Sequence, residues 1–120
     1  MKDPGLYIIH IHESLQKITK YSQDGRQAFM ADAKTQDAVI RNFEVIGEAT
    51  NRLPTEFTVA YPDIPWRKMA AFRDILIHAY ERVDMQEIWN IIEQHVPRLL
   101  ARIQDVRTKL EESTKKAGSS

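Results

Sequence analysis

The 120-residue sequence contains no cysteine and only four glycines, and it has no excess of charge of either sign. The missing cysteine excludes disulfide bonds and thiolate metal ligands, and it fits an intracellular protein. Seventeen basic and seventeen acidic side chains balance each other. This balance argues against a broad nucleic-acid-coating surface and against a polybasic membrane patch. A small, locally positive site for a nucleic acid is still allowed.

Long apolar runs are also absent. No stretch approaches the roughly 20 residues that a membrane-spanning helix needs, and the amino terminus lacks the basic-then-apolar pattern of a signal peptide. We therefore expect a cytoplasmic protein without membrane association. The sequence has no glycine-rich phosphate loop, no G-x-S-x-G elbow and no segment with the two-residue period of a strand.

Apolar residues instead recur at helical spacing in the first half of the chain. Asp3-Pro4 has the pattern of an N-cap followed by proline at the first helical position, and predicts a helix of about 18 residues. A short helical piece at 27–31 precedes a second long helix over 35–53. Gly47 is unfavourable inside that helix by about 1 kcal/mol relative to alanine. We expect it to permit the close approach of another helix.

The second half of the chain predicts two more helices. The loop between Pro54 and Pro65 is so apolar that we expect it to pack in an ordered way. A third helix is predicted over 66–80, and Asp84-x-x-Glu87 has the pattern of a capping pair for a fourth helix. The apolar stripe of the fourth helix is Met85, Trp89, Ile92, Val96, Leu99, Ile103, Val106 and Leu110. Pro97 inside this stripe should kink the helix without necessarily ending it.

These elements predict an all-α fold, an up-and-down bundle of four to five helices. We expect one domain over residues 1–110 and a polar, disordered tail over 111–120. The apolar surface of the third and fourth helices together is larger than a single thin bundle can bury. We therefore expect a two-fold symmetric homodimer with the third helices near the axis.

The third helix contains the residues that point most clearly to a chemical function. Residues 69–80 are apolar except for Arg73, Asp74 and His78, with Tyr80 at the end. Buried charges are rare unless they are paired. On a helix, Asp74 and His78 are i,i+4 neighbours, and Tyr80 is at i+7 from Arg73. An arginine for phosphate, a histidine for proton transfer and a carboxylate to orient the histidine form a phosphodiester-cleaving set.

Structural interpretations of the charged residues stay open beside this one. The polar cluster could be an ion-pair network at a subunit interface. Arg41, Glu44 and Glu48 could form a solvated face of the second helix, or one of the two glutamates could support the cluster on the third helix. His10 and His12 lack the i,i+3 or i,i+4 spacing of a zinc pair, so we expect exposed residues there.

The histidines also lack the pattern of a di-iron bundle, which requires two Glu-x-x-His motifs. The residues three positions before the four histidines are Tyr7, Ile9, Ile75 and Ile92. We therefore expect no metal and no cofactor.

Four segments in order give the chain a resemblance to a known family. They are Lys34–Arg41, Ile46–Ala49, Ile64–Lys68 and Arg73–Tyr80. The last segment, Arg73-x4-His78-x-Tyr80, resembles the R-x4-6-H motif of the HEPN superfamily. The four segments together resemble the HepT toxins, the toxin half of HEPN/MNT toxin–antitoxin pairs. The resemblance extends from about residue 6 to residue 110.

The resemblance implies a homodimeric, metal-independent endoribonuclease, with Arg73 and His78 as catalytic residues in a composite cleft between two motif helices. Its partner would be a small MNT-type nucleotidyltransferase antitoxin. In this family the antitoxin can silence the toxin by transferring AMP from ATP to the motif tyrosine, here Tyr80. The residue after the motif arginine is often asparagine in the superfamily. Asp74 stands there instead and adds negative charge near a bound phosphate.

The chemistry agrees with that reading, because RNA contains its own nucleophile, the 2′-hydroxyl. Proton transfer and charge stabilisation at phosphorus are then sufficient. Two non-catalytic functions stay open. The bundle could be an interaction module for a nucleotidyltransferase-like partner, or a module that binds a nucleotide in the same cleft without cutting RNA.

Overall fold

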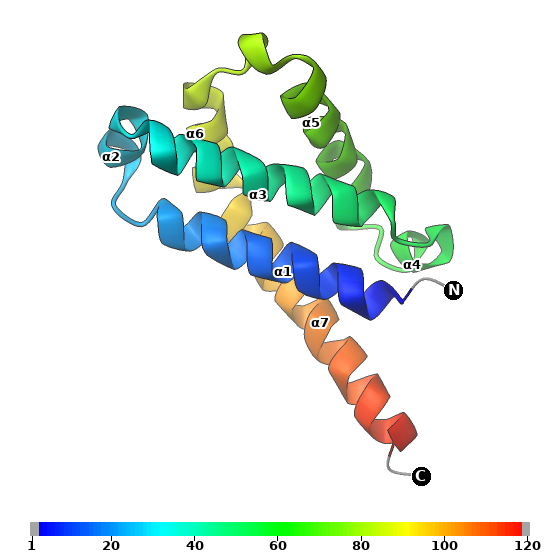
Figure 1. The fold of residues 1–120 in the computed structure, drawn as a ribbon. Coiled ribbons are helices and arrows are strands. Elements are labelled where there is room, and N and C mark those ends of the chain that lie inside the picture. Colours follow the sequence, from blue (N-terminus) through cyan, green and yellow to red (C-terminus); the bar gives the residue numbers. More distant parts are fainter. Residues whose placement is uncertain (1–2, 119–120) are drawn as a thin grey trace.

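The computed structural model describes the backbone of residues 3–118 and the side chains as far as residue 115; this part of the chain is helical and contains no strand (Figure 1). Its elements are α1 (Pro4–Tyr21), α2 (Arg26–Ala31), α3 (Ala33–Asn51), α4 (Thr55–Val59), α5 (Trp66–His78), the 3-10 helix η1 (Tyr80–Arg82), α6 (Met85–Gln94) and α7 (Val96–Gly118). The predicted all-α fold is confirmed. Within residues 3–118, seven α-helices replace the expected four or five, because the proline-rich loop contains a short helix and the last long helix is divided.

Helix α1 packs against both α3 and α7 (Figure 1). The carboxylate of Asp3 caps it by accepting a hydrogen bond from the Gly5 N–H at 2.9 Å, as the Asp3-Pro4 pattern predicts. The apolar stripe of α1 is completely buried and consists of Ile8, Ile11, Leu15 and Ile18. Helix α5 packs on the far side of α3, so α3 separates α5 from α1.

The apolar loop before α5 packs against the bundle, as expected. Ile64 is buried, and the Trp66 indole N–H donates to the Tyr61 carbonyl at 3.0 Å. Phe57 stacks near Tyr61 with a ring-centre distance of 5.2 Å. Val59 is the exception, because 68% of its surface is exposed.

Two helix ends differ from the sequence-based expectation. Helix α5 ends at His78, two residues earlier than predicted. The predicted fourth helix is broken rather than kinked, with His95 (φ −114°, ψ −36°) between α6 and α7. Pro97 explains the break, because its ring has no N–H for the Glu93 carbonyl and would clash with that carbonyl in a continuous helix. Pro97 is the second residue of α7, and at that position a backbone N–H would have no acceptor within the helix, so its absence costs no hydrogen bond.

The segment that we expected to be a disordered tail is helical as far as Gly118, and residues 119–120 lie outside the described range. Local side-chain contacts accompany this extension. Arg107 pairs with Glu111 at 3.0 Å, one helical turn further on, and the Thr114 hydroxyl donates to the Leu110 carbonyl at 3.0 Å. Figure 1 shows the end of α7 extending beyond the other helices.

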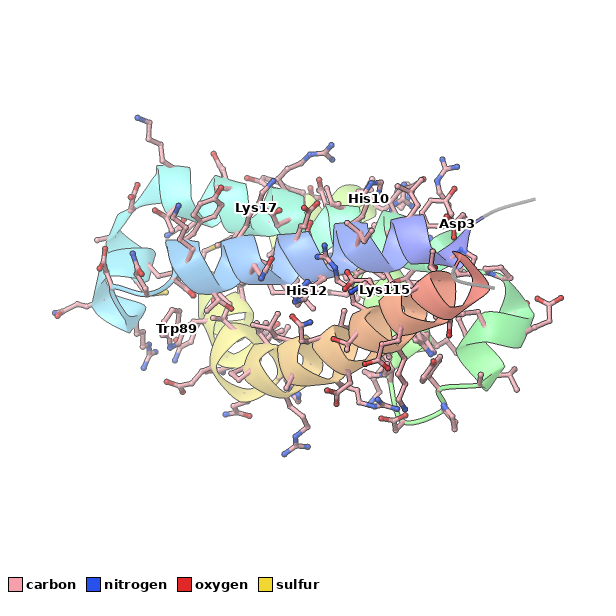
Figure 2. All side chains as sticks on the ribbon, turned by 90° about the horizontal axis from the view of Figure 1, so that it is seen from below. Asp3, His10, His12, Lys17, Trp89 and Lys115 are labelled. Carbon is pink, nitrogen blue, oxygen red and sulfur yellow. The ribbon has the colours of Figure 1, made fainter. Side chains whose placement is uncertain are left out.

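His12 is buried rather than exposed, with only 4% of its surface accessible. It points from α1 toward α7 (Figure 2), where the Arg107 guanidinium lies 2.9 Å from its Nδ1 atom. Burial and the nearby Arg107 cation lower the pKa of His12 below its ordinary value. The helical spacing of α1 could not reveal this, because the burial depends on the packing of α7 against α1.

Candidate functional site

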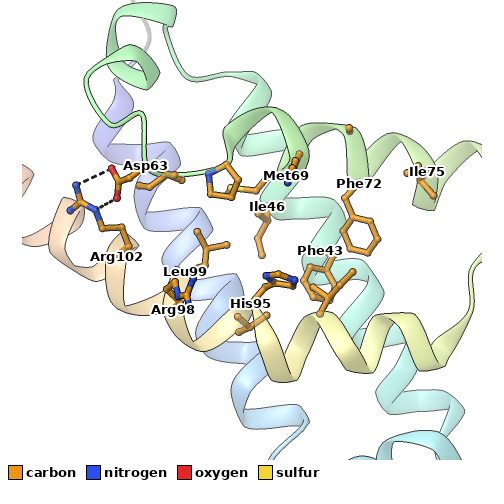
Figure 3. A pocket seen from close by; sticks show the side chains of 16 residues that line it. Phe43, Ile46, Asp63, Met69, Phe72, Ile75, His95, Arg98, Leu99 and Arg102 are labelled. Carbon is orange, nitrogen blue, oxygen red and sulfur yellow. Dashed lines mark hydrogen bonds and ion pairs between the residues drawn. The ribbon is translucent and has the colours of Figure 1, made fainter.

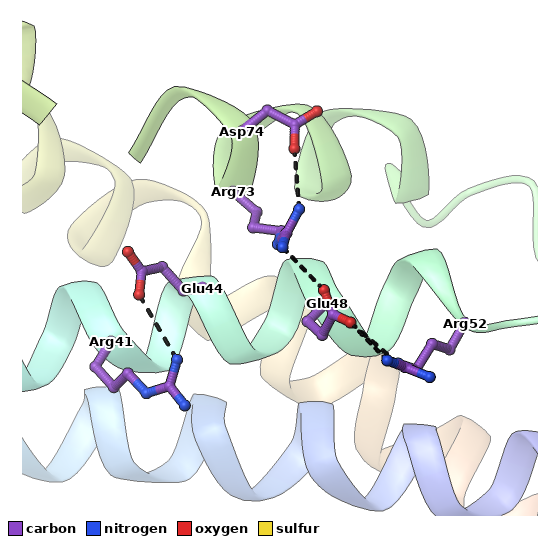
Figure 4. A network of polar contacts seen from close by, with 6 residues as sticks. All are labelled: Arg41, Glu44, Glu48, Arg52, Arg73 and Asp74. Carbon is purple, nitrogen blue, oxygen red and sulfur yellow. Dashed lines mark hydrogen bonds and ion pairs between the residues drawn. The ribbon is translucent and has the colours of Figure 1, made fainter. Parts of the chain in front are cut away.

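Arg73 is held between two carboxylates, one from a neighbouring helix and one from its own helix. Its Nη2 atom lies 3.1 Å from Oε2 of Glu48 on α3, and its Nη1 atom lies 3.2 Å from Oδ1 of Asp74 (Figure 4). The Arg73 side chain is 28% exposed. The guanidinium is therefore anchored at the helix surface, where a ligand from solvent can reach it.

Glu48 is in turn held by a second arginine. Arg52, the residue that follows the end of α3, places both Nε and Nη2 at 3.0 Å from Oε1 of Glu48. The Glu48 carboxylate raises the pKa of Arg52 above its ordinary value. Of the two glutamates that could support the cluster on α5, Glu48 does so, whereas Glu44 pairs with Arg41 at 3.7 Å. We call Glu48, Arg52, Arg73 and Asp74 the arginine network.

Gly47 allows α3 and α5 to approach closely beneath this network. A Cβ atom at position 47 would collide with the Cβ atom of Arg73, and it would lie 3.1 Å from the Met69 carbonyl oxygen. The prediction that Gly47 serves close helix packing is therefore confirmed. The contact also fixes the backbone from which the Arg73 side chain extends.

Asp74 has a different partner from the one that the helical spacing suggested. Its carboxylate accepts from Arg73, and no contact in the described part of the chain joins it to His78. The Asp74 side chain is 59% exposed. His78 is the last residue of α5 and is also exposed. Both side chains are open to solvent on the helix that contains Arg73.

Tyr80 does not belong to α5, so the expectation that it lies two helical turns after Arg73 on the same helix is wrong. The helix stops because Ala79 adopts a non-helical conformation (φ −127°, ψ 38°), and Tyr80 begins η1. Tyr80 nevertheless has 56% of its surface exposed. Its side chain is therefore accessible to another protein, two residues after His78.

A groove with a volume of about 670 Å³ runs between α5 on one side and α6 and α7 on the other (Figure 3). Its apolar lining consists of Phe43, Ile46, Ile64, Pro65, Met69, Ala71, Phe72, Ile75, Ile91, Val96 and Leu99. Lys68, His95, Arg98 and the ion pair between Arg102 and Asp63 (2.6 Å) form its polar edge. None of Arg73, Asp74, His78 and Tyr80 lines it.

The comparison with protein families decides which family the chain represents. Residues 11–106 match the family described as "Ribonuclease HepT-like". The chain belongs to the HepT-like ribonuclease family. This confirms the resemblance found in the sequence and is consistent with the HEPN superfamily.

Relatives of this HepT-like chain include a protein of Thermococcus cleftensis named "Probable ribonuclease HepT". It is 39% identical over 102 residues, which cover 84% of this chain and 93% of that protein. A protein of Methanocaldococcus jannaschii, named as a putative RNase, is 39% identical over 111 residues, 92% of either chain.

A second M. jannaschii protein, named as a gamma-glutamylcyclotransferase and putative RNase, is 39% identical over 113 residues. Those residues cover 93% of this chain but 51% of that protein, so the chain spans about half of its length. No solved structure matches the chain.

Two features of the HepT-like chain were missed in the sequence. Arg52 was not assigned a role, although its i,i+4 spacing from Glu48 is typical of an ion pair. The groove was also missed, because it depends on how far α6 and α7 lie from α5. Among residues 3–118, no group of three or more His, Asp or Glu side chains could hold a metal ion, and no helix is long and apolar enough to span a membrane.

Proposed function

We propose that this HepT-like chain is a metal-independent endoribonuclease, with Arg73 and His78 as its catalytic residues. The observation that most supports this is the arginine network. The network holds the guanidinium of Arg73 where solvent can reach it, and His78 lies exposed at the end of the same helix. An arginine that served only to pair with carboxylates could lie anywhere on the surface. Here Gly47 and Glu48 together constrain one particular arginine in the family motif.

The proposed reaction uses the substrate's own 2′-hydroxyl as nucleophile. A base removes its proton, the 2′-oxygen attacks the adjacent phosphorus, and the bond from phosphorus to the 5′-oxygen breaks. The leaving oxygen takes a proton from an acid, and the products are a 2′,3′-cyclic phosphate and a 5′-hydroxyl. Arg73 would stabilise the charge on the phosphorane-like transition state, and His78 would transfer a proton.

A second copy of the chain would complete this proton transfer. Cleavage needs one base and one acid, and each chain brings one His78 to the motif. A two-fold dimer with α5 near the axis would bring two histidines and two motif arginines into one cleft. Ile75 and Ile77 support this assembly, since they leave 52% and 42% of their surfaces exposed on α5, and Ile75 also lines the apolar groove.

We further propose that the chain is the toxin of a HEPN/MNT-type pair and acts on RNA in the cytoplasm. The partner would be an MNT-type nucleotidyltransferase antitoxin. In the regulatory reaction, the Tyr80 hydroxyl oxygen attacks the α-phosphorus of ATP, its proton passes to a base of the partner, and pyrophosphate leaves. The exposed position of Tyr80 supports this site. The attached nucleotide would obstruct RNA by its bulk and by its negative phosphate.

The proposed catalytic residues are tested by single substitution. Arg73→Ala and His78→Ala should each reduce RNA cleavage in EDTA by about 10²–10⁴-fold, the typical effect of removing a positioned proton-transfer group. Helicity should stay unchanged, because His78 is exposed and the ion pairs of Arg73 lie at the surface, where such pairs contribute little to stability. The dimer mass should persist as well, and it is measured beside the cleavage rate. Cleavage at the wild-type rate in either variant would show that the activity lies elsewhere.

The groove favours one alternative, a non-catalytic interaction or nucleotide-binding module that partners a nucleotidyltransferase. This function predicts that purified wild-type protein leaves RNA intact under every condition, while it still binds the nucleotidyltransferase. The cleavage assay with the two alanine variants therefore separates the two functions.

A further inference from the structure

The two carboxylates that contact Arg73 are held in very different ways (Figure 4). Glu48 uses one oxygen for Arg73 and the other for two nitrogens of Arg52, at 3.0 to 3.1 Å in each case. Asp74 offers one oxygen to Arg73 at 3.2 Å, and its side chain is 59% exposed. Glu48 is thus fixed from two sides on a neighbouring helix, whereas Arg73 is the one partner of Asp74 among the described side chains.

We propose that Glu48 is a positioning residue for Arg73 and that Asp74 is a placeholder for the phosphate of the substrate. When RNA binds, the phosphate takes the place of Asp74 beside Nη1, and Glu48 keeps its contact with Nη2. This inference rests on the proposed function, because it concerns how the same arginine meets RNA.

The geometry of the guanidinium makes this exchange possible. Arginine presents five N–H donors in a rigid planar fork that matches carboxylate and phosphate oxygens alike. One anion can therefore replace another at Nη1 without a new orientation of the group. A free arginine side chain would lose much rotamer freedom on binding phosphate. The Glu48 contact removes that freedom before the substrate arrives.

The exchange is easier at Asp74 than at Glu48. Asp74 can turn into solvent around its own side-chain bonds, since more than half of its side chain is already exposed. Glu48 could leave only by breaking its contacts with Arg52 as well. The close approach at Gly47 also fixes the distance between the two helices, so the Arg73 backbone stays within reach of Glu48.

Glu48→Gln and Asp74→Asn form a matched pair that tests this assignment. Each variant removes one negative charge beside Arg73 and nearly preserves the size of the side chain. Exposed ion pairs contribute little to stability, so both variants should fold. Glu44→Gln is the control, because Glu44 lies one turn earlier on α3 and pairs with Arg41.

Two measurements use these variants. The first is the dissociation constant for a 2′-O-methyl RNA oligonucleotide, which cannot be cut, together with the cleavage rate of the unmodified RNA. The second is the NMR spectrum of the Arg73 guanidinium, in which a held group gives separate Nη signals and a rotating group gives averaged ones.

We expect Glu48→Gln to average the Arg73 signals and to slow cleavage by about 10²-fold, the effect that a misplacement of about 1 Å can have. Asp74→Asn should keep the signals separate and bind the oligonucleotide more tightly than wild type. Glu44→Gln should match wild type in both measurements. Equal effects of Glu48→Gln and Asp74→Asn would overturn the proposal, because charge alone would then explain both.

The failure of this inference can be distinguished from the failure of the proposed function. If wild type cuts RNA but the two variants behave alike, the ribonuclease function stands and the positioning role is wrong. If wild type does not cut RNA, the ribonuclease function fails. The NMR measurement then still decides whether Glu48 holds Arg73, because it needs no substrate.

Discussion

An alanine at position 47 should disturb the candidate site although it removes none of its charged groups. Its Cβ atom would collide with Cβ of Arg73 and lie 3.1 Å from both Cγ of Arg73 and the carbonyl oxygen of Met69. Neither a backbone carbonyl nor a Cβ atom can rotate away. Helices α3 and α5 must therefore move apart until carbon atoms reach their ordinary contact distance of about 3.5–4.0 Å.

The expected loss of stability is modest, because two effects oppose each other. Forcing an extra methyl group into a packed contact costs about 1–3 kcal/mol. Alanine is favoured over glycine in a helix interior by about 1 kcal/mol. The free energy of unfolding of Gly47→Ala should therefore fall by about 0–2 kcal/mol. Gly47→Val should lose more, since its side chain is larger and β-branched.

Urea denaturation followed by circular dichroism measures this loss, and the comparison must use one protein concentration because assembly affects apparent stability. The cleavage rate should fall even where the free energy of unfolding is almost unchanged, because the shift moves Arg73 away from Glu48. A Gly47→Ala protein that is stabilised by about 1 kcal/mol and cuts RNA at the wild-type rate would refute this reasoning. The close contact at Gly47 would then play no part in positioning Arg73.

Three further predictions concern pH, assembly and modification. Because burial lowers the pKa of His12, the unfolded chain binds the proton first. The contribution of His12 to the free energy of unfolding should therefore be fully present above about pH 6.5, the pKa in the unfolded chain. It should be lost as the pH falls toward the lowered pKa of the folded state, and the His12→Gln protein should not show this pH dependence. Light scattering should give twice the 14.0 kDa chain mass for wild type and the monomer mass for Ile75→Asp; a wild-type monomer would contradict the composite site. Co-expression with the nucleotidyltransferase should add AMP to wild type but not to Tyr80→Phe, and unmodified wild type in mass spectrometry would point to inhibition by occlusion instead.

Much of the fold could be predicted because the decisive signals are local. The Asp3-Pro4 pair marks the start of α1, and the stripe of isoleucine and leucine on that helix marks its buried side. Gly47 likewise predicted a close helix contact, because a glycine inside a helix lowers its stability and is expected only where the backbone of another helix must come close. These features depend on the chain within a few turns, where spacing and capping act.

The errors occurred where a distant segment or a weak signal decides the outcome. Nothing at Ala79 resembles a helix stop, since neither glycine nor proline follows it, so the end of α5 and the position of Tyr80 were missed. Asp74 was assigned to His78 by helical spacing, but the guanidinium of Arg73 is the partner that the structure shows. The burial of His12 depends on α7, which lies far away in sequence.

The most direct test of the account is the analysis of cleavage products by mass spectrometry. A defined RNA would be incubated in EDTA with wild type and with His78→Ala, beside the same sequence with 2′-O-methyl groups. The account predicts fragments with 2′,3′-cyclic phosphate and 5′-hydroxyl ends from wild type, and none from His78→Ala or from the methylated RNA. Fragments with 5′-phosphate ends, a requirement for added metal, or the same products from His78→Ala would contradict it.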